Sequence, residues 1–376
     1  MKKLLSSILA LTMILTLATT SSAAESQITV EQASEQVALS FMQNSLNESV
    51  EIAETTPFYD LDNNVTAYHV SFSLNGTPSG YVLISLLNLD NPIVEFAFEG
   101  PGLVSTIAEK QAKSATNAVS SDNIYFLGAG GLFTGDPSTE LQNVYDGGNY
   151  PAQKLNESYQ ETLARTPMPM NDVVIRDGIL SWDNASIDTS SLEEIPYFGS
   201  GSDYWLLDDF SKGNNVCSPT CATNILWYWG VQRGYDWVVE SGDKTGFDLA
   251  DWLFTVMSLD MGTIPPLGTL NVWVIGAYRE FLEDRGSNFS LITLTDNKYS
   301  DFTDAVDSGN PVHTMLRNES LFSLGHDVMT FGYGESTRGT EYLFVMDGWE
   351  DYGRFVNFDY YPIIKGIEVS IGSTPD

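Results

Sequence analysis

The segment from Asn215 to Gly230 constrains this chain more than any other stretch. Within it, four apolar residues recur at i, i+3, i+4 and i+7, which is the pattern of a helix that faces a core. They are Ala222, Ile225, Leu226 and Trp229. Ser218 then suits the N-cap, Pro219 the first helical position and Gly230 the C-terminal end of that helix.

Cys217 therefore lies immediately ahead of a buried helix. Free N–H groups and the positive end of the helix dipole favour a thiolate at such a place. Because the thiolate is the form of cysteine that attacks, the segment predicts a cysteine nucleophile at Cys217.

The N-terminus predicts export. A basic start, Met1-Lys2-Lys3, precedes an apolar run from Leu4 to Leu17 and the small residues Ser22-Ala23-Ala24. This order is typical of a secretory signal peptide, here residues 1–24, and the apolar run is too short to favour a membrane span. We therefore expect a secreted, extracellular protein with no membrane partner.

Length and charge narrow the class further. A chain of 376 residues favours two folded units, and 43% hydrophobic residues can form a sizeable core. The 50 Asp and Glu residues outnumber the 17 Lys and Arg residues, which gives a formal net charge of −33. Such an acidic chain would be repelled by nucleic acid and by anionic membranes, so we expect neither as a partner.

The two cysteines, Cys217 and Cys221, leave a structural alternative open. A disulfide is common in exported proteins. However, residues i and i+4 of one helix rarely direct their Cβ atoms toward relaxed S–S geometry. The fold must then be stabilised by its core.

No metal or cofactor is expected. The stretch Asp60-Leu61-Asp62-Asn63-Asn64 lacks the Gly and the final Glu of a calcium loop and favours a turn between strands. Beyond the cysteine segment, the sequence has no clustered set of His and Cys ligands.

Residues 25–105 predict a small α+β domain. Thr29 and Gln32 have capping-box spacing at the start of a helix whose apolar face includes Ala33, Val37, Ala38 and Phe41. Three strands are expected after it, at Ala67–Leu74, Gly80–Leu86 and Ile93–Phe98.

Residues 106–172 have a weaker pattern and are expected to be a connector with some local structure, partly exposed to proteolysis. Residues 173–376 predict a second α+β domain, with helices first and an antiparallel sheet second. Its further helices are expected at Leu249–Leu259 and Leu270–Arg285. Its strands are expected at Pro311–Leu316, His326–Tyr333, Tyr342–Asp347 and Arg354–Tyr361.

A cysteine nucleophile needs a base, and the chain has three histidines. His69 and His313 favour structural roles, whereas His326 begins a strand. If that strand forms a hairpin centred near Ser336 and Thr337, Asp347 faces His326 with Cβ atoms within about 5.5 Å. A carboxylate there would hold the imidazole tautomer. Asp327 would point to the opposite face. The predicted catalytic set is therefore Cys217, His326 and Asp347.

Several motifs resemble one family. Cys-Ser-Pro-Thr-x-Ala-x-Asn from Cys217 resembles the Cys-Gly-Pro-Thr-Ala-Ala-type nucleophile motif of C39-like cysteine peptidases, which have a papain-like fold. Gly325–Tyr333 looks like the family's histidine strand, and Val345–Trp349 like its third-residue segment. Gly309–Val312 and Arg354–Asn357 are similar to the strands on either side. The resemblance covers roughly Ile175 to Gly372.

A weaker resemblance concerns the N-terminal unit. Pro57–Asp60, Ala67-Tyr68 and Gly80–Ser85 are similar to the propeptides of secreted bacterial cysteine peptidases of the streptopain type. This implies a zymogen in which residues 25–105 act as an intramolecular inhibitor until the connector is cut.

The chain also departs from the family pattern. Papain-fold enzymes usually have a Gln six residues before the nucleophile, where its amide helps to bind the oxyanion. Here that position is Ser211, so Asn214, Asn215 or the N–H of Cys217 could take this role. Cys221 stands where the motif usually has alanine.

The resemblance implies a hydrolase that cleaves protein or peptide substrates by acyl transfer through Cys217, His326 and Asp347. Two alternatives stay open. One is an inactive papain-fold binding module with an oxidised Cys217–Cys221 pair, and the other is an amide hydrolase or acyltransferase on the same fold.

Overall fold

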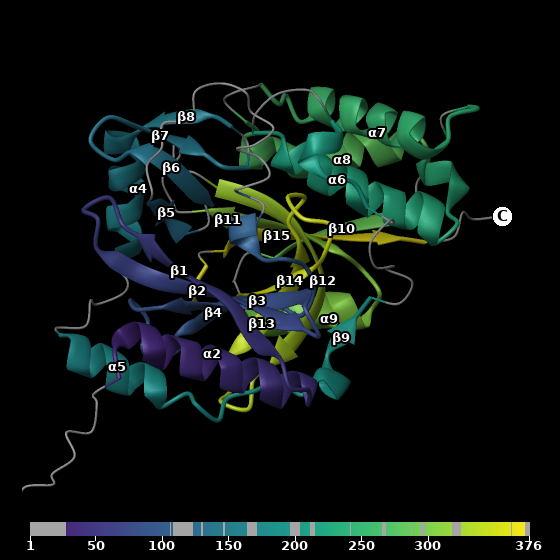
Figure 1. Ribbon diagram of the computed structural model, residues 1–376. Coiled ribbons are helices and arrows are strands. Elements are labelled where there is room, and N and C mark those ends of the chain that lie inside the picture. Colours follow the sequence, from purple (N-terminus) through teal and green to yellow (C-terminus); the bar gives the residue numbers. More distant parts are fainter. Residues whose placement is uncertain are drawn as a thin grey trace, which may run out of the picture.

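The computed structural model describes residues 28–105, 107, 123–128, 131–145, 147–163, 171–195, 204–210, 215–240, 242–264, 268–286, 288–294, 298–317, 325–361 and 363–372. Its architecture is mixed α/β, with helices on two opposite sides of one large sheet (Figure 1). Helices α6, α7 and α8 lie on one side, and α2 and α5 lie on the other. The proposed signal peptide, residues 1–24, lies outside the described residues.

The N-terminal unit confirms the predicted helix and strands. Thr29 forms the capping box with Gln32, and the predicted apolar face of the helix is fully buried. The turn after Asp60 forms because its Oδ1 accepts the N–H groups of Asp62 and Asn64. The elements are α2 (Val30–Leu46), β1 (Glu51–Tyr59), β2 (Val65–Leu74), β3 (Thr77–Ser85) and β4 (Ile93–Ala97).

Strand β1 was not predicted. It contains Glu51, Glu54 and Pro57, and its outer residues are exposed, so it lacks the apolar alternation that marks a strand. The connection between β2 and β3 is shorter than the gap from Leu74 to Gly80 that the predicted strands left. Asn75 and Gly76 both have positive φ, 53° and 78°, which suits a two-residue hairpin turn.

The range 106–172, expected as a connector, contains a second run of strands. Strand β5 pairs in parallel with β1 and extends the sheet beyond it. Successive antiparallel pairs then join β5 to β6, β6 to β7 and β7 to β8. The elements are β5 (Ile124–Phe126), β6 (Leu132–Asp136), β7 (Glu140–Asn143), β8 (Asn149–Pro151) and α4 (Ala152–Leu163).

The C-terminal half contains the predicted helices and strands within a few residues of the expected bounds, except that β14 is shorter. It adds α5, β9, β10, α9 and β15, which were not predicted. The main elements are α5 (Asp172–Leu180), β9 (Glu193–Glu194), α6 (Cys217–Trp227), α7 (Gly246–Asp260), α8 (Asn271–Glu283), β10 (Phe289–Leu294), α9 (Tyr299–Asp307), β11 (Val312–Arg317), β12 (Gly325–Glu335), β13 (Glu341–Met346), β14 (Arg354–Asn357) and β15 (Ile363–Ile371).

One sheet runs through the whole molecule. Its order is β10-β15-β11-β12-β13-β14-β4-β3-β2-β1-β5-β6-β7-β8, with β9 paired to β12. The two halves join where β14 pairs antiparallel with β4. There the rings of Phe96 and Phe355 stack at 4.7 Å, and the Tyr342 hydroxyl donates to the carbonyl of Ile93 at 2.9 Å. The N-terminal unit therefore continues the sheet and core of the C-terminal half.

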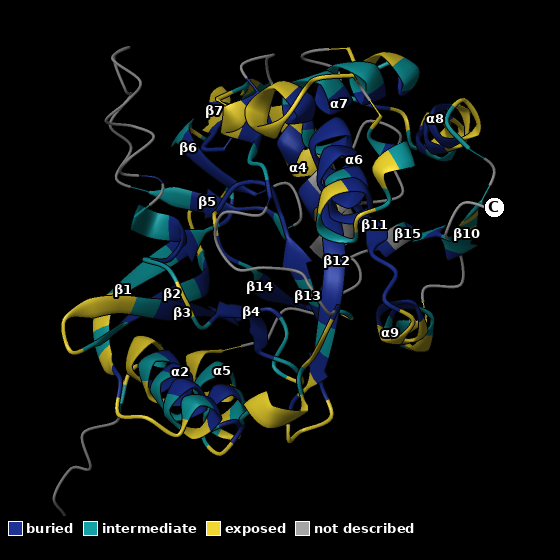
Figure 2. Ribbon diagram, turned by 90° about the vertical axis from the view of Figure 1, so that its right-hand side faces the viewer, coloured by how far each residue is buried: buried dark blue, intermediate teal, exposed yellow. Residues whose placement is uncertain are grey.

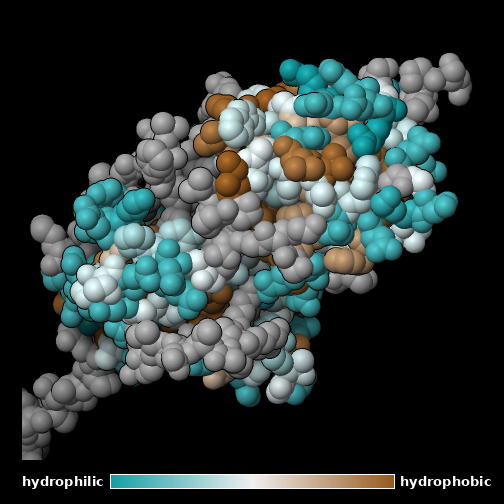
Figure 3. Space-filling view, turned by 90° about the horizontal axis from the view of Figure 1, so that it is seen from above, coloured by the Kyte–Doolittle hydropathy of each residue, from teal (hydrophilic) through white to brown (hydrophobic). Residues whose placement is uncertain are grey.

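The central strands are buried, whereas helices such as α2 and α7 expose part of their outer sides (Figure 2). The view from above shows apolar groups among the polar ones (Figure 3). Exposed apolar residues occur around the α7–α8 connection, at Leu259, Ile264, Leu270 and Val272. Among the described residues, no helix combines the length and apolar character that a membrane crossing needs.

His69 is buried inside the N-terminal unit. Its Nε2 accepts the N–H of Leu103 at 3.2 Å, and its ring stacks with those of Phe58 and Tyr81. Burial lowers the pKa of His69 from 6.5 to about 3. The folded protein therefore keeps this imidazole neutral at pH values where an unfolded chain would protonate it.

We predict that His69 makes the fold sensitive to acid. Between pH 6.5 and 3 the unfolded state binds one proton more, so stability falls as the pH falls through this window. From pH 7 to pH 5 the wild type should lose about 2 kcal/mol of unfolding free energy more than His69→Gln. Urea titrations of both proteins at the two pH values measure this, and equal losses would contradict it.

Candidate active site

Cys217 is the first residue of α6, with Val216 at the N-cap. The prediction of Ser218 as N-cap was wrong, because the helix begins one residue earlier and the Ser218 hydroxyl bonds elsewhere. Pro219 is then the third helical residue, where its missing N–H still costs nothing. Because Cys217 is still at the N-terminus of the helix, the positive end of the helix dipole still favours its thiolate.

The apolar stripe of α6 is buried as predicted, with Ala222, Ile225 and Leu226 fully covered. Gly230 does not end the helix. The chain continues into a π-helical turn, Tyr228–Gln232, and a Cβ at Gly230 would lie 2.2 Å from the Val239 side chain. Glycine is needed there for close packing.

His326 is the second residue of β12 and is only 3% exposed. Its Nε2 lies 2.7 Å from the backbone carbonyl oxygen of Asp347. Because a carbonyl oxygen only accepts, Nε2 carries the proton, and Nδ1 is the unprotonated nitrogen of the neutral ring. His326 is therefore held in a tautomer whose Nδ1 can take a proton.

The predicted register of the hairpin was wrong. Its turn is centred near Arg338, and a bulge between Thr330 and Gly332 shifts the pairing by one residue. The last β12–β13 pair is Met329 with Met346, so Asp347 lies beyond the ladder. It reaches His326 through its backbone carbonyl.

The carboxylate of Asp347 has other partners. Its Oδ1 accepts the N–H groups of Trp349 at 2.7 Å and Glu350 at 3.2 Å, and its Oδ2 lies 3.0 Å from Nε of Arg354. Burial raises the pKa of Asp347, although Arg354 and the two N–H groups oppose this effect. The carboxylate thus fixes the loop whose carbonyl contacts the imidazole.

Arg354 connects this loop to the N-terminal unit. Its Nη1 donates to Oε1 of Glu95 on β4 at 2.7 Å, and the hydroxyl of Tyr361 donates to Glu95 Oε2 at the same distance. Burial disfavours the guanidinium, but Glu95 and Asp347 together raise the pKa of Arg354. Neither role was predicted, since Glu95 and Arg354 are 259 residues apart in the sequence.

Three segments converge at the candidate site. A Cβ at Gly348 would lie 3.4 Å from the Thr220 side chain, so the loop after Asp347 touches the first turn of α6. The hydroxyl of Ser218 donates to Oδ2 of Asp327. Because these two residues directly follow Cys217 and His326, their bond brings the nucleophile helix to the histidine strand.

Trp349 covers the imidazole. The rings of His326 and Trp349 stack at 3.7 Å, and Tyr145 stacks on Trp349 at 3.9 Å, with both pairs nearly parallel. Tyr145 follows β7, in the range expected as a connector. A residue from outside the C-terminal half therefore covers the indole from its other side.

A second tyrosine of that range reaches the loop before Cys217. Tyr150 on β8 donates its hydroxyl to Oδ1 of Asn215 at 3.1 Å, and Asn215 has a left-handed φ of 61°. Ser211 and Asn214, the other residues considered for the oxyanion, lie outside the described residues. A Cβ at Gly268 would lie 3.4 Å from Asn215, so the α7–α8 connection borders this loop.

Both cysteines are free thiols. Cys221 is buried on α6, and burial, together with Asp327 and Cys217, raises the pKa of its thiol well above the ordinary value. Cys221 is therefore a poor nucleophile, whereas Cys217 is only partly buried.

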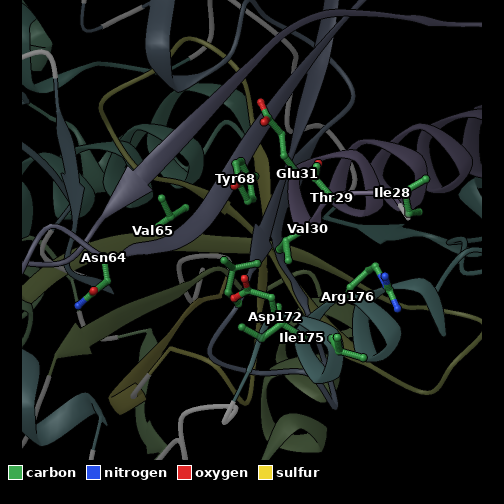
Figure 4. A pocket seen from close by; sticks show the side chains of 12 residues that line it. Ile28, Thr29, Val30, Glu31, Asn64, Val65, Tyr68, Asp172, Ile175 and Arg176 are labelled. Carbon is green, nitrogen blue, oxygen red and sulfur yellow. The ribbon is translucent and has the colours of Figure 1, made fainter. Parts of the chain in front are cut away.

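A cavity of about 690 Å³ lies elsewhere, between α2, β2 and α5 (Figure 4). Thr29, Glu31, Tyr68 and Arg176 are among its lining residues, and none of the predicted catalytic residues is. Burial and nearby carboxylates raise the pKa of Tyr68 to about 12. The described residues contain no group of three or more His, Cys, Asp and Glu side chains suited to a metal ion.

Residues 202–363 match the model of the Peptidase_C39 like family. The match supports a C39-like cysteine peptidase domain in this part of the chain, and the mixed α/β architecture is consistent with a papain-like fold. It includes Cys217, His326 and Asp347, whereas β1–β8 lie outside it. No curated protein matches the chain.

We predict that Arg354 is essential for stability. Arg354→Met would leave Glu95 and Asp347 buried without their cation, which should lower the unfolding free energy by about 3–5 kcal/mol. Adding Glu95→Gln should restore part of this loss.

Arg176→Met is the matched control, because its partner Asp177 is exposed and such pairs contribute about 0–1 kcal/mol. Chemical denaturation of the three variants measures the differences. Equal small losses for Arg354→Met and Arg176→Met would refute the role of Arg354.

Proposed function

We propose that the protein is a secreted cysteine peptidase that cleaves peptide bonds through Cys217, His326 and Asp347. The observation that carries this proposal is the convergence of a cysteine at a helix N-terminus with a histidine held in one tautomer. The C39-like family match over this region supports it. Export rests on the signal-peptide pattern of residues 1–24.

The chemistry is acyl transfer. Nδ1 of His326 takes the proton of the Cys217 thiol, and the thiolate attacks the substrate carbonyl. The imidazolium then gives this proton to the leaving amine as the C–N bond breaks, which leaves a thioester on Cys217. Water attacks the thioester with His326 as base, and the acid product and the thiol are released.

Asp347 has an orienting role in this proposal. Its carbonyl accepts the Nε2 proton of His326, and its carboxylate anchors the loop through Trp349 and Arg354. The N–H of Cys217, at the first position of α6, is the first candidate donor to the oxyanion. Asn215 is a second candidate donor.

Residues 25–105, together with the strands of the range 106–172, would keep the enzyme inactive as an intramolecular inhibitor. His326 is 3% and Trp349 9% exposed, and Tyr145 covers Trp349. Tyr150 is bonded to Asn215, beside the nucleophile. These contacts support a zymogen in which the segments preceding the peptidase domain restrict access until residues 106–172 are cut.

We predict that catalysis and fast alkylation depend on Cys217. Iodoacetamide should label Cys217 of the matured protein rapidly, and Cys217→Ala or His326→Ala should lower casein hydrolysis at least about 1,000-fold. Cys221→Ala is the control and should keep both properties.

Peptide mapping and a casein assay provide the readouts. Slow labelling shared equally by both cysteines would overturn the proposal in favour of a binding module. Fast labelling of Cys217 without cleavage of any peptide would instead favour an amide hydrolase or acyltransferase.

We also predict that processing activates the enzyme. If residues 164–170 are replaced by the recognition sequence of a site-specific protease, cleavage and removal of the N-terminal fragment should raise casein hydrolysis at least tenfold, on the order of 1.4 kcal/mol in the barrier. In the uncut chain, Tyr145→Ala should speed alkylation of Cys217.

Tyr159→Ala is the matched control, because Tyr159 is a buried tyrosine of the same range that packs in a different cluster. It should leave the alkylation rate unchanged. If the uncut wild type hydrolyses casein as fast per reactive thiol as the cut protein, the zymogen proposal is wrong.

A further inference from the structure

Four buried polar side chains form a chain of hydrogen bonds that the proposed mechanism does not use. Ser218 Oγ donates to Oδ2 of Asp327, and this oxygen lies 3.2 Å from Nε2 of His313. Nδ1 of His313 lies 3.1 Å from the hydroxyl of Tyr278. Each of the four residues is at most 1% exposed.

The chain links four elements in order: α6, β12, β11 and α8. His313 and Asp327 are diagonal neighbours on one face, since Met315 pairs with Asp327 and His313 with Met329. This face is opposite to that of His326, because successive residues of a strand alternate. The hydrogen bonds therefore lie behind the candidate site.

The polar groups of these four side chains are hydrogen-bonded to one another. Asp327 accepts from Ser218 and from Nε2–H of His313, and Nδ1 of His313 forms a hydrogen bond with the Tyr278 hydroxyl. Burying a carboxylate costs several kcal/mol, and apolar side chains of similar volume would often stabilise a core as well. These hydrogen bonds instead fix the arrangement of the helices and strands that they connect.

The hydrogen bond between Ser218 and Asp327 lies directly beside the two proposed catalytic residues. Ser218 follows Cys217 directly, and Asp327 follows His326 directly, so one hydrogen bond joins the backbones that carry the proposed nucleophile and base. In the Cys-Gly-Pro-Thr form of the motif, glycine stands where this chain has Ser218. The hydroxyl that makes the bond is thus a feature of this sequence.

We propose that Ser218, Asp327 and His313 are positioning residues that hold Cys217 and His326 at their reacting separation. This inference rests on the proposed peptidase function. Displacing a catalytic group by about 1 Å can lower a rate about 100-fold, so loss of the Ser218 hydroxyl acts on the chemical step more than on substrate binding.

Ser218→Ala in the full chain, processed and titrated for active Cys217, tests the inference. We expect kcat to fall about 10- to 100-fold with KM within about twofold of the wild type. We also expect the pH profile of Cys217 alkylation to move up toward that of an ordinary thiol, with a pKa near 8.5. Tyr278→Phe, which removes the hydroxyl at the other end of this series of hydrogen bonds, should lower kcat less.

Thr314→Val is the matched control. The hydroxyls of Thr314 and Thr330 lie 2.6 Å apart and are fully buried between the same two strands, β11 and β12. This hydrogen bond does not involve a residue of α6. The control variant should lower the Tm about as much as Ser218→Ala but leave kcat and the alkylation profile within about twofold of the wild type.

The outcomes separate the two proposals. If the wild type hydrolyses peptides and Ser218→Ala matches Thr314→Val in kcat and alkylation, the positioning role is overturned and the peptidase stands. If the wild type hydrolyses no peptide but Ser218→Ala still shifts the alkylation profile, the positioning role stands alone. A wild-type Cys217 that alkylates like an ordinary thiol overturns both.

Discussion

The packing of α6 against β12 governs the rest of this structure. Cys217 is at the start of that helix and His326 is near the start of that strand, so neither residue is useful unless the two elements meet in one register. The buried bond from Ser218 to Asp327 defines the meeting point, and Ala222 and Ile225 of α6 belong to the same buried apolar cluster as Met329 and Phe331 of β12. Apolar burial provides the affinity between elements, whereas the polar contact selects one arrangement.

Charge is organised differently inside and outside the molecule. The chain has a formal net charge of −33, yet Arg354, one of only 17 Lys and Arg residues, is buried between two carboxylates. Its Nη1 contacts Glu95 on β4 and its Nε contacts Asp347, so one guanidinium pairs with both carboxylates. In the uncut chain, the loop beside His326 is thus connected through Arg354 to a residue of the N-terminal unit that lies outside the family match.

Local patterns predicted the local structure well. The capping box at Thr29, the stripe of α6 and the strands around His326 follow from spacing alone, and the structure has them. Long-range features did not follow from spacing. The turn is centred near Arg338 and not between Ser336 and Thr337, which changed the register before Asp347, and the polar strand β1 lacked alternation. Tyr145 and Glu95 contact the site from segments far away in sequence. The bond of Ser218 to Asp327 had no sequence signal, since either residue alone suits several roles.

The pairing of β4 with β14 has a consequence for how the chain folds. Glu95 and Arg354 are 259 residues apart, so closing this contact comes late and is entropically costly. Strands β2, β3 and β4 pair through short hairpins and can form soon after synthesis. Their open edge at β4 would then be a template on which the C-terminal strands assemble. The N-terminal unit would thus help the C-terminal strands to find their order in the sheet.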